Sequence, residues 1–139
     1  FRTSTPKREA SLLPYLLEPR PMLFDINLSV KLKTAESVAS HTIAQTNYSY
    51  MYYSAAQQLA HHASSSCAMT AGDLLGQAQL GLLELSWSGK YPITLPTGQT
   101  RNFLEDGDTL ALEGVAIGKN FQIGFGTCSG TIKRASSSN

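Results

Sequence analysis

The chain has 139 residues, of which 42% are hydrophobic and 15% are charged, a composition that suits one domain or a piece of a larger one. The 11 Lys and Arg residues against 10 Asp and Glu residues leave a net charge of +1, and without a basic block we expect no nucleic-acid partner. No apolar run approaches the roughly 20 residues of a membrane helix and no signal peptide is visible, so we expect a cytoplasmic protein with no membrane partner.

Residues 1–22 are expected to form an extended, irregular lead-in. Their start, FRTSTPKREA, lacks an initiator Met, so we expect that the chain begins within a longer polypeptide. The segment holds four of the 6 prolines, and each proline lacks a backbone donor and restricts the residue before it. Its apolar side chains would be costly to leave in water, so we expect these residues to pack on a surface: Leu12, Leu13, Tyr15, Leu16 and Leu17.

The clearest pattern in the sequence is an alternation of apolar and polar residues over 24–33. It predicts a strand with one buried face and one polar face. Residues 41–45 are expected to form a second short strand. The apolar positions of the first strand are Phe24, Ile26, Leu28, Val30 and Leu32.

Apolar residues at helical spacing predict one main helix over about 48–63. Thr46 or Asn47 can cap its N-terminus, because Thr and Asn side chains accept hydrogen bonds from the first free N–H groups. The tyrosines of this stretch fit core or interface packing better than chemistry. His61 and His62 would diverge by about 100° on a helix, so they cannot chelate one metal and are interpreted as structural.

The remainder of the chain reads as short strands separated by turns. Residues 91–95 form an expected edge strand, since Pro92 interrupts it. Residues 100–104 and 109–114 are expected to flank a hairpin turn at 105–108, and 121–130 is a glycine-laced strand. The whole is predicted to be an α+β fold, predominantly β, with about eight short strands.

The stretch LLELSW at 82–87 is the most unusual of these predicted strands. Alternation places Leu83, Leu85 and Trp87 on one face, with Glu84 on the other. Glu is depleted from strands and is seldom buried without a partner. Glu84 therefore points either to solvent, which is the usual outcome, or into a catalytic pocket.

Other candidate sites are weak. Glu105, Asp106 and Asp108 could bind a cation, but a turn of the Asp-Gly type needs these residues for its backbone, and we favour the turn. Cys67 and Cys128 fit no CxxC spacing, which argues against a zinc site. They form either one disulfide or two free thiols, and without a secretory signal we favour free thiols.

Several stretches, in order, resemble the C-terminal part of the fumarylacetoacetate hydrolase family. The strings GQTRNFLEDGD and QQLAHH are similar to the long fumarylacetoacetase branch in particular. The resemblance covers most of the chain, which makes residues 1–139 a C-terminal portion of such a catalytic domain. The matching strings are LPYL at 13–16, FDINLSVKLK at 24–33, YSYMYYSAAQQLAHH at 48–62, GDLLG at 72–76, LLELSW at 82–87, GQTRNFLEDGDTLALEG at 98–114 and GFGTCSG at 124–130.

The resemblance implies a β-sandwich or roll that is a homodimer and hydrolyses a carbon–carbon bond of a β-diketone. It implies release of fumarate and acetoacetate in tyrosine and phenylalanine degradation. It also implies a divalent metal, Mg²⁺ or Ca²⁺, that polarises the diketone oxygens, and a water activated by a His–carboxylate pair. Glu84 matches the carboxylate of that pair and would orient the catalytic His.

The chain also departs from the family pattern in several places. The catalytic His, the acidic metal ligands and the oxyanion-stabilising side chains of the family lie upstream of the region resembled, and His41, His61 and His62 do not match that His. The substrate-binding Thr loop of the family, GTxSGPE, is lacking between Gly76 and Leu82. Either this loop is deleted or the 139-residue sequence skips residues there, and we favour the second explanation.

We therefore expect this chain alone to be inactive and to need the upstream part of the same enzyme as its partner. Two alternatives stay open. The chain could be a non-catalytic structural or dimerisation module of the same fold. It could also be part of a related enzyme that cleaves another acylpyruvate.

Overall fold

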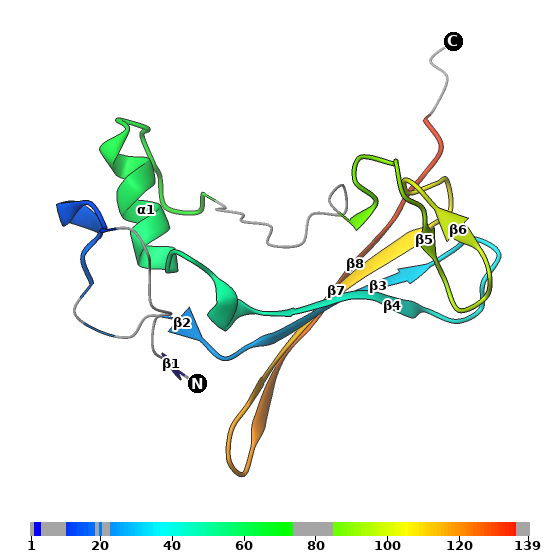
Figure 1. Ribbon diagram of the computed structural model, residues 1–139, viewed down its shortest axis with the longest axis horizontal. Coiled ribbons are helices and arrows are strands. Elements are labelled where there is room, and N and C mark those ends of the chain that lie inside the picture. The colour runs from blue at the N-terminus through cyan, green and yellow to red at the C-terminus, as the bar shows by residue number, and fades with distance from the viewer. Residues whose placement is uncertain (1, 4–10, 19, 21–22, 74–84, 136–139) are drawn as a thin grey trace.

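A computed structural model of the chain describes residues 2–3, 11–18, 20, 23–73 and 85–135 (Figure 1). Most of its elements are strands in antiparallel sheets, with α1 as the main helix, which confirms the predicted α+β, mainly β fold. In chain order the elements are β1 (Arg2–Thr3), the 3₁₀ helix η1 (Pro14–Leu16), β2 (Leu23–Phe24), β3 (Asn27–Lys33), β4 (His41–Asn47), the 3₁₀ helix η2 (Tyr48–Tyr50), α1 (Ala55–Ser64), β5 (Ile93–Thr94), β6 (Thr100–Arg101), β7 (Thr109–Ile117) and β8 (Gln122–Thr131).

The main sheet has four antiparallel strands in the order β4-β3-β7-β8. The register pairs Leu28 with Gly114 and Leu32 with Leu110, so the alternating strand predicted from residues 24–33 lies at the centre of the sheet. The β7–β8 hairpin projects away from the other strands (Figure 1). Two smaller two-stranded sheets pair β1 with β2 and β5 with β6.

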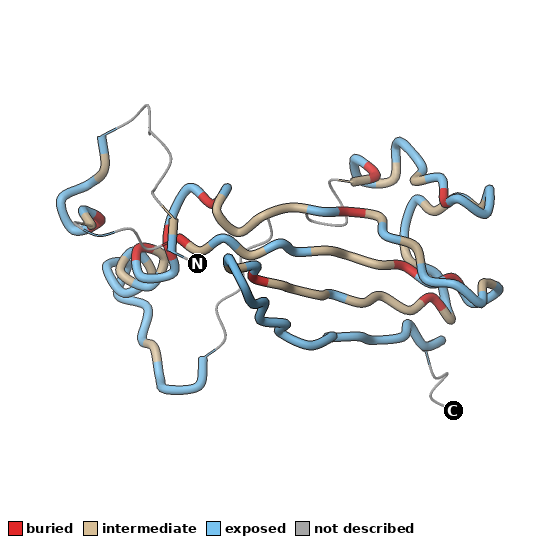
Figure 2. The backbone as a smooth tube through the Cα atoms, turned by 90° about the horizontal axis from the view of Figure 1, so that it is seen from below, coloured by how far each residue is buried: buried red, intermediate tan, exposed pale blue. Residues whose placement is uncertain are grey.

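Buried residues of the main sheet lie at both of its ends, Leu32 opposite Leu110 near the start of β7 and Ala116 near the end of β7. Leu32, Ala44 and Ala116 are buried, whereas Leu28 in the same alternating series is 37% exposed. All ten residues of β8 are exposed, and its tube is pale blue along its length (Figure 2). The predicted alternation is therefore present, but the described residues cover only part of the face that it predicts to be buried.

The main helix begins later than predicted. Asn47 does act as a cap, since its side chain accepts a hydrogen bond from the Ser49 N–H, but the helix that it caps is η2. The α-helix α1 begins at Ala55 instead, because Ser54 and Gln57 form a reciprocal capping box. A capping box satisfies two free backbone N–H groups at once, which favours a new helix start at this point.

The Pro-rich lead-in is held to α1 by a buried polar contact. The Gln57 side chain donates from Nε2 to the Leu16 carbonyl oxygen at 2.6 Å, and Leu16 is itself buried. The expectation that this segment packs on a surface is thus confirmed for Leu16. It is wrong for Leu13 and Leu17, whose side chains are largely exposed.

The turn at 105–108 does not join two strands of one hairpin. Its backbone is a turn, with Gly107 at φ 90°, but β6 before it pairs with β5, whereas β7 after it pairs with β3 and β8. The predicted hairpin is therefore wrong. Among the described residues, no helix is long and apolar enough to cross a membrane.

Candidate functional site

Glu84 is the one catalytic candidate from the sequence, and it lies outside the described part of the chain, within residues 74–84. The expected position of the family's Thr loop, between Gly76 and Leu82, lies in the same range. The residues that follow are described. Leu85 has a helical backbone, and turns follow it from Ser86 to Lys90. The strand predicted over 82–87 is therefore wrong for residues 85–87.

The turn after Leu85 has a clear local cause. Ser86 is 1% exposed, and its Oγ accepts a hydrogen bond from the Gly89 N–H at 3.2 Å. The Ser86 carbonyl oxygen accepts the N–H of Tyr91 at 3.0 Å, which closes the turn. Trp87 and Ser88 have φ values of 50° and 57°, in the left-handed region that strands do not use. These side-chain and backbone hydrogen bonds override the apolar pattern that predicted a strand.

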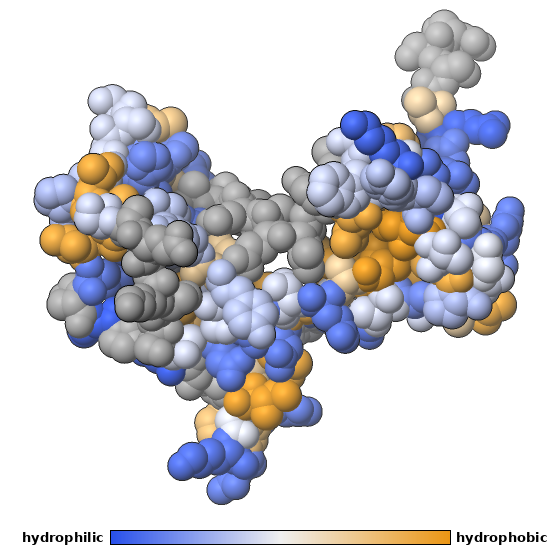
Figure 3. Space-filling model, viewed as in Figure 1, coloured by the Kyte–Doolittle hydropathy of each residue, from blue (hydrophilic) through white to orange (hydrophobic). Residues whose placement is uncertain are grey.

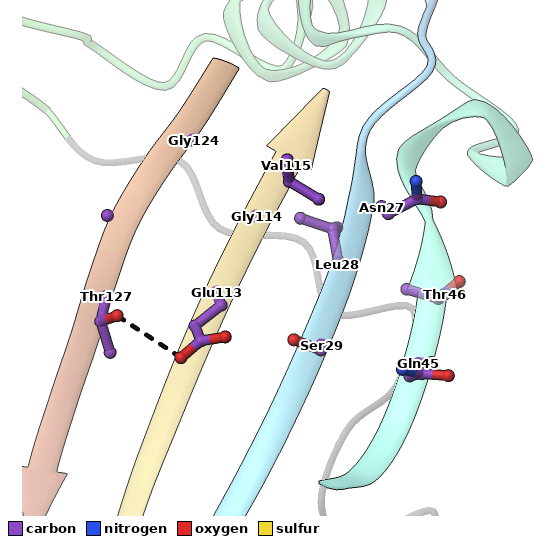
Figure 4. Close-up of a pocket in the computed structure, with 11 residues that line it drawn as sticks. Asn27, Leu28, Ser29, Gln45, Thr46, Glu113, Gly114, Val115, Gly124 and Thr127 are labelled. Carbon is purple, nitrogen blue, oxygen red and sulfur yellow. Dashed lines mark hydrogen bonds between the residues drawn. The ribbon is translucent and has the colours of Figure 1, made fainter. Parts of the chain in front are cut away.

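A groove of about 580 Å³ crosses the main sheet, lined by residues of all four strands (Figure 4). Its one carboxylate is that of Glu113, whose Oε2 lies 2.6 Å from the Nζ of Lys31. Thr127 Oγ1 donates to the other carboxylate oxygen at 3.5 Å. The lining residues are Asn27, Leu28, Ser29, Gln45, Thr46, Glu113, Gly114, Val115, Gly124, Gly126 and Thr127.

The Glu113 carboxylate is committed to an ion pair, which limits what the groove can do. Lys31 Nζ and Thr127 Oγ1 each contact one of the two carboxylate oxygens, so both oxygens already have a donor. The Lys31 and Glu113 side chains are both about a third exposed, so the pair contributes about 1 kcal/mol or less to stability. The groove therefore has polar groups that could orient a ligand, but no acid–base pair.

Two of the three histidines, His61 and His62, line one cavity, and the third, His41, lies on β4. His61 Nδ1 is 3.1 Å from the hydroxyl of Tyr15, and the two rings are stacked with centroids 6.4 Å apart. His62 lines the same cavity of about 280 Å³ as His61, next to the lead-in segment. The Nε2 of His41 on β4 is buried and has no hydrogen-bond partner among the described residues. The interpretation of His61 and His62 as structural residues remains a prediction.

Asp108 has a fully buried side chain, and its ion pair was not predicted from the sequence. Its carboxylate accepts hydrogen bonds from Arg101 Nε at 2.9 Å and Arg101 Nη2 at 3.2 Å. Burial by itself raises the pKa of Asp108, but hydrogen bonds from Arg101 and from the Glu105 N–H outweigh burial and hold that pKa below its usual value. The same hydrogen bond raises the pKa of Arg101.

Asp73 is another carboxylate in a stretch that resembles the family, and it forms hydrogen bonds within a turn. Asp73 of GDLLG accepts hydrogen bonds from the backbone N–H of Thr70 at 2.8 Å and from the Thr70 hydroxyl at 3.0 Å. These bonds, the backbone one first, hold the pKa of Asp73 below its usual value. Asp73 therefore closes a turn in the described structure.

The described residues do not fit a metal centre. No three His, Cys, Asp or Glu side chains come together among them in a way that could hold an ion. Asp108 is committed to Arg101, so the turn interpretation of 105–108 describes it better than the cation interpretation. Cys67 and Cys128 are free, as predicted, and both are exposed.

No family model matches the chain. Individual proteins do match it. It is 42% identical over 141 residues to a protein named fumarylacetoacetase from Homo sapiens, a match that covers 95% of this chain and 34% of that protein. It is homologous to fumarylacetoacetases. The identity is 40% to the protein of that name from Dictyostelium discoideum and 43% to fumarylacetoacetase fahA from Aspergillus fumigatus, over 95% of this chain in both cases.

The fumarylacetoacetase resemblance is therefore confirmed over nearly the whole chain, although the chain spans about a third of the length of the curated relatives it matches. The alignment with the human protein has 141 positions, which exceeds the 139 residues of this chain. The human fumarylacetoacetase thus carries residues within the matched span that this chain lacks.

Proposed function

We propose that this chain is one part of a fumarylacetoacetase-type hydrolase that cleaves a carbon–carbon bond of fumarylacetoacetate. The observation that carries the proposal is the identity of about 40% over 95% of the chain with proteins of that name. The match covers about a third of each relative, which supports a site whose other residues lie in the remaining two thirds of the enzyme. The assembled enzyme would be a homodimer.

Glu84 is proposed as the positioning residue of this site. Its carboxylate would accept the N–H of a histidine from the other part of the enzyme and stabilise the protonated ring. That histidine removes a proton from water as the water oxygen bonds to the diketone carbonyl carbon. The carbon–carbon bond then breaks, its electron pair stays on the leaving acetoacetate carbon, and that carbon takes up a proton.

The divalent metal expected from the resemblance, Mg²⁺ or Ca²⁺, would be held by residues outside this chain. The described carboxylates leave no set of ligands for it. The proposal therefore assigns this chain the orienting carboxylate and no metal ligand.

The test is complementation. The full 139-residue chain is mixed with the unmatched two thirds of the human relative, produced separately, and cleavage of fumarylacetoacetate is followed with each part alone and with both together. Activity only in the mixture is the expected result. Cleavage of simple acylpyruvates in preference to fumarylacetoacetate would favour the related-acylpyruvase alternative instead.

Glu84→Gln is expected to lower activity in the mixture by about a hundredfold or more, since a mispositioned base loses most of its contribution. It should also lower the apparent pKa on the acidic limb of the pH–rate profile, because the charge that stabilises protonated histidine is gone. Glu84→Asp should restore part of the rate. The matched control is Glu105→Gln, an exposed glutamate of this chain, and full activity of Glu84→Gln would refute the role.

A structural or dimerisation module of the same fold is the second candidate. It is favoured by the described groove and cavity, in which no carboxylate lies with a histidine and no three metal-ligating side chains come together. A 1:1 complex with the other part that cleaves no β-diketone would support this candidate over the enzyme.

A further inference from the structure

β8 is an unprotected sheet edge. Within the described residues it has a strand neighbour on one side alone, β7, and all ten of its residues are exposed. Its sequence, QIGFGTCSGT, contains no charged residue and no proline. Proteins use charge and proline to block unwanted pairing at an edge, so an edge without them is open to another strand.

An apolar patch lies on one face of the sheet next to this edge. We call it the apolar face and define it as Leu28, Leu112, Ile123 and Phe125, which are 37%, 48%, 46% and 62% exposed. The register places Leu28 opposite Gly114, and Leu112 is two residues before that glycine on the same face. A Cβ at Gly114 would lie 3.3 Å from Leu28 Cδ2 and 3.4 Å from Phe125 Cδ2, so both side chains flank the glycine.

A one-residue bulge brings Phe125 onto this face. The β7–β8 register pairs Glu113 with Thr127 but Val115 with Gly124, so β8 has one extra residue there, and Gly126 has φ 77°. Hydrophobic side chains also lie at the surface of the projecting β7–β8 hairpin (Figure 3).

The opposite face of the same sheet is polar. It carries the Lys31–Glu113 ion pair, and the hydroxyls of Thr109 and Thr131 lie 2.8 Å apart across β7 and β8. An antiparallel sheet with one solvent-exposed face normally packs its other face against the core of the protein. In the described structure the other face is covered only in part: Leu32 and Ala116 are buried, whereas Leu28 and Leu112, which lie between them, are exposed.

We propose that the apolar face and the free edge of β8 dock the remaining two thirds of a fumarylacetoacetase-length chain. That remainder would place apolar side chains on the apolar face and a strand beside β8. The proposal rests on the proposed function, because the occupant is the rest of that enzyme. The length argues for this occupant: the chain spans about a third of its relatives, which leaves a partner large enough to cover the whole sheet.

The test uses the full 139-residue chain and the unmatched two thirds of the human relative. Binding is measured by calorimetry, and hydrogen exchange of the amides of residues 122–131 is measured with and without the other part. We expect a 1:1 complex in which the β8 amides are protected. Phe125→Asp should weaken binding by about a hundredfold or more, since it places a charge in an apolar contact.

The matched control is Ser129→Asp, which places the same charge on the same strand. Ser129 pairs with Ala111 and so faces away from the apolar face, and it should change binding by about threefold or less. Ile123→Asp is a second variant on the apolar face, and circular dichroism checks that each variant folds.

Two outcomes would overturn the docking proposal. One is a complex that leaves β8 unprotected and tolerates Phe125→Asp, even if the mixture cleaves fumarylacetoacetate, in which case the proposed function stands alone. The other is protection of β8 by a second copy of this chain that persists when the other part is added. Protection by the other part without cleavage of any β-diketone would support the docking surface and refute the proposed function.

Discussion

Arg101 and Asp108 form a two-point ion pair that fixes the turn before β7. The guanidinium donates from Nε and Nη2 to the two carboxylate oxygens, and the Asp108 side chain is fully buried. Two backbone hydrogen bonds of 2.8 Å surround this pair. The Gly107 N–H donates to the Ile132 carbonyl oxygen, and the Ile132 N–H donates to the backbone carbonyl oxygen of Asp108. The string GQTRNFLEDGD, which carried much of the resemblance, thus has a structural function at this point.

Removing the charge of this pair should destabilise the fold. Asp108→Asn leaves Arg101, whose side chain is 11% exposed, with the more distant and exposed carboxylate of Glu105 at 3.4 Å, and we expect a loss of about 2 to 4 kcal/mol in the free energy of unfolding. Urea denaturation followed by circular dichroism measures the loss. Asp106→Asn, at an exposed pair with Arg134, is the control and should change stability by about 0.5 kcal/mol or less. Equal effects of both substitutions would contradict this account.

The same pair predicts an acid-sensitive fold. The pKa of Asp108 is lower in the folded chain than in the unfolded chain, where it is about 3.9. Its contribution to stability is therefore present above pH about 4 and is lost as the pH falls through the folded-state pKa. The free energy of unfolding should differ between the unchanged chain and Asp108→Asn by the same amount from pH 5 to 8, on the order of the loss at neutral pH. This difference should shrink below pH about 4. A difference that grows on acidification would have the wrong sign.

Two glycines with the same backbone conformation should respond differently to alanine. Gly98 and Gly107 have φ values of 85° and 90°, but a Cβ at Gly98 meets nothing within 4 Å, whereas one at Gly107 lies 2.7 Å from the Cβ of Ala35. Gly98→Ala should cost about 1 kcal/mol of backbone strain. Gly107→Ala should cost about 1 to 3 kcal/mol more, because it adds a steric clash. Thermal denaturation of the two variants compares them directly, and equal melting temperatures would rule out the clash.

The start of α1 should depend on its capping box. Ser54→Ala removes the Oγ that accepts the Gln57 N–H and that donates to Glu18 at 2.8 Å, and should cost about 1 kcal/mol. Limited proteolysis should then cut residues 11–18 faster, since Gln57 also holds Leu16. Ser64→Ala at the exposed end of α1 is the control. If both variants resist protease equally well, the box does not anchor the lead-in.

Local patterns predicted most of the fold. The alternation that includes Leu28, Val30 and Leu32 is a property of neighbouring residues, and it correctly placed β3. The start of α1 was missed because the spacing of Tyr48 and Met51 also fits a helix, and the competing capping box was not recognised.

The partners of charged and amide groups could not be predicted in the same way. Gln57 and Leu16 are 41 residues apart, and the sequence alone does not show which distant carbonyl a buried amide will meet. Asp108 was correctly assigned to a turn, but its ion pair with Arg101 follows from tertiary packing. The role of Glu84 stays a prediction, since it depends on residues outside the described part of the chain.

The direct pairing of β3 with β7 has a consequence for how the chain can vary in length. Lys31 and Glu113 are 82 residues apart in sequence, so the two strands close a very long loop. The entropy lost in closing a loop grows with the logarithm of its length, by about 0.6 kcal/mol per doubling. Adding or removing several residues inside this loop would change that cost by about 0.1 kcal/mol. Insertions and deletions between the strands can therefore be selected for their chemistry, with almost no thermodynamic penalty to the sheet.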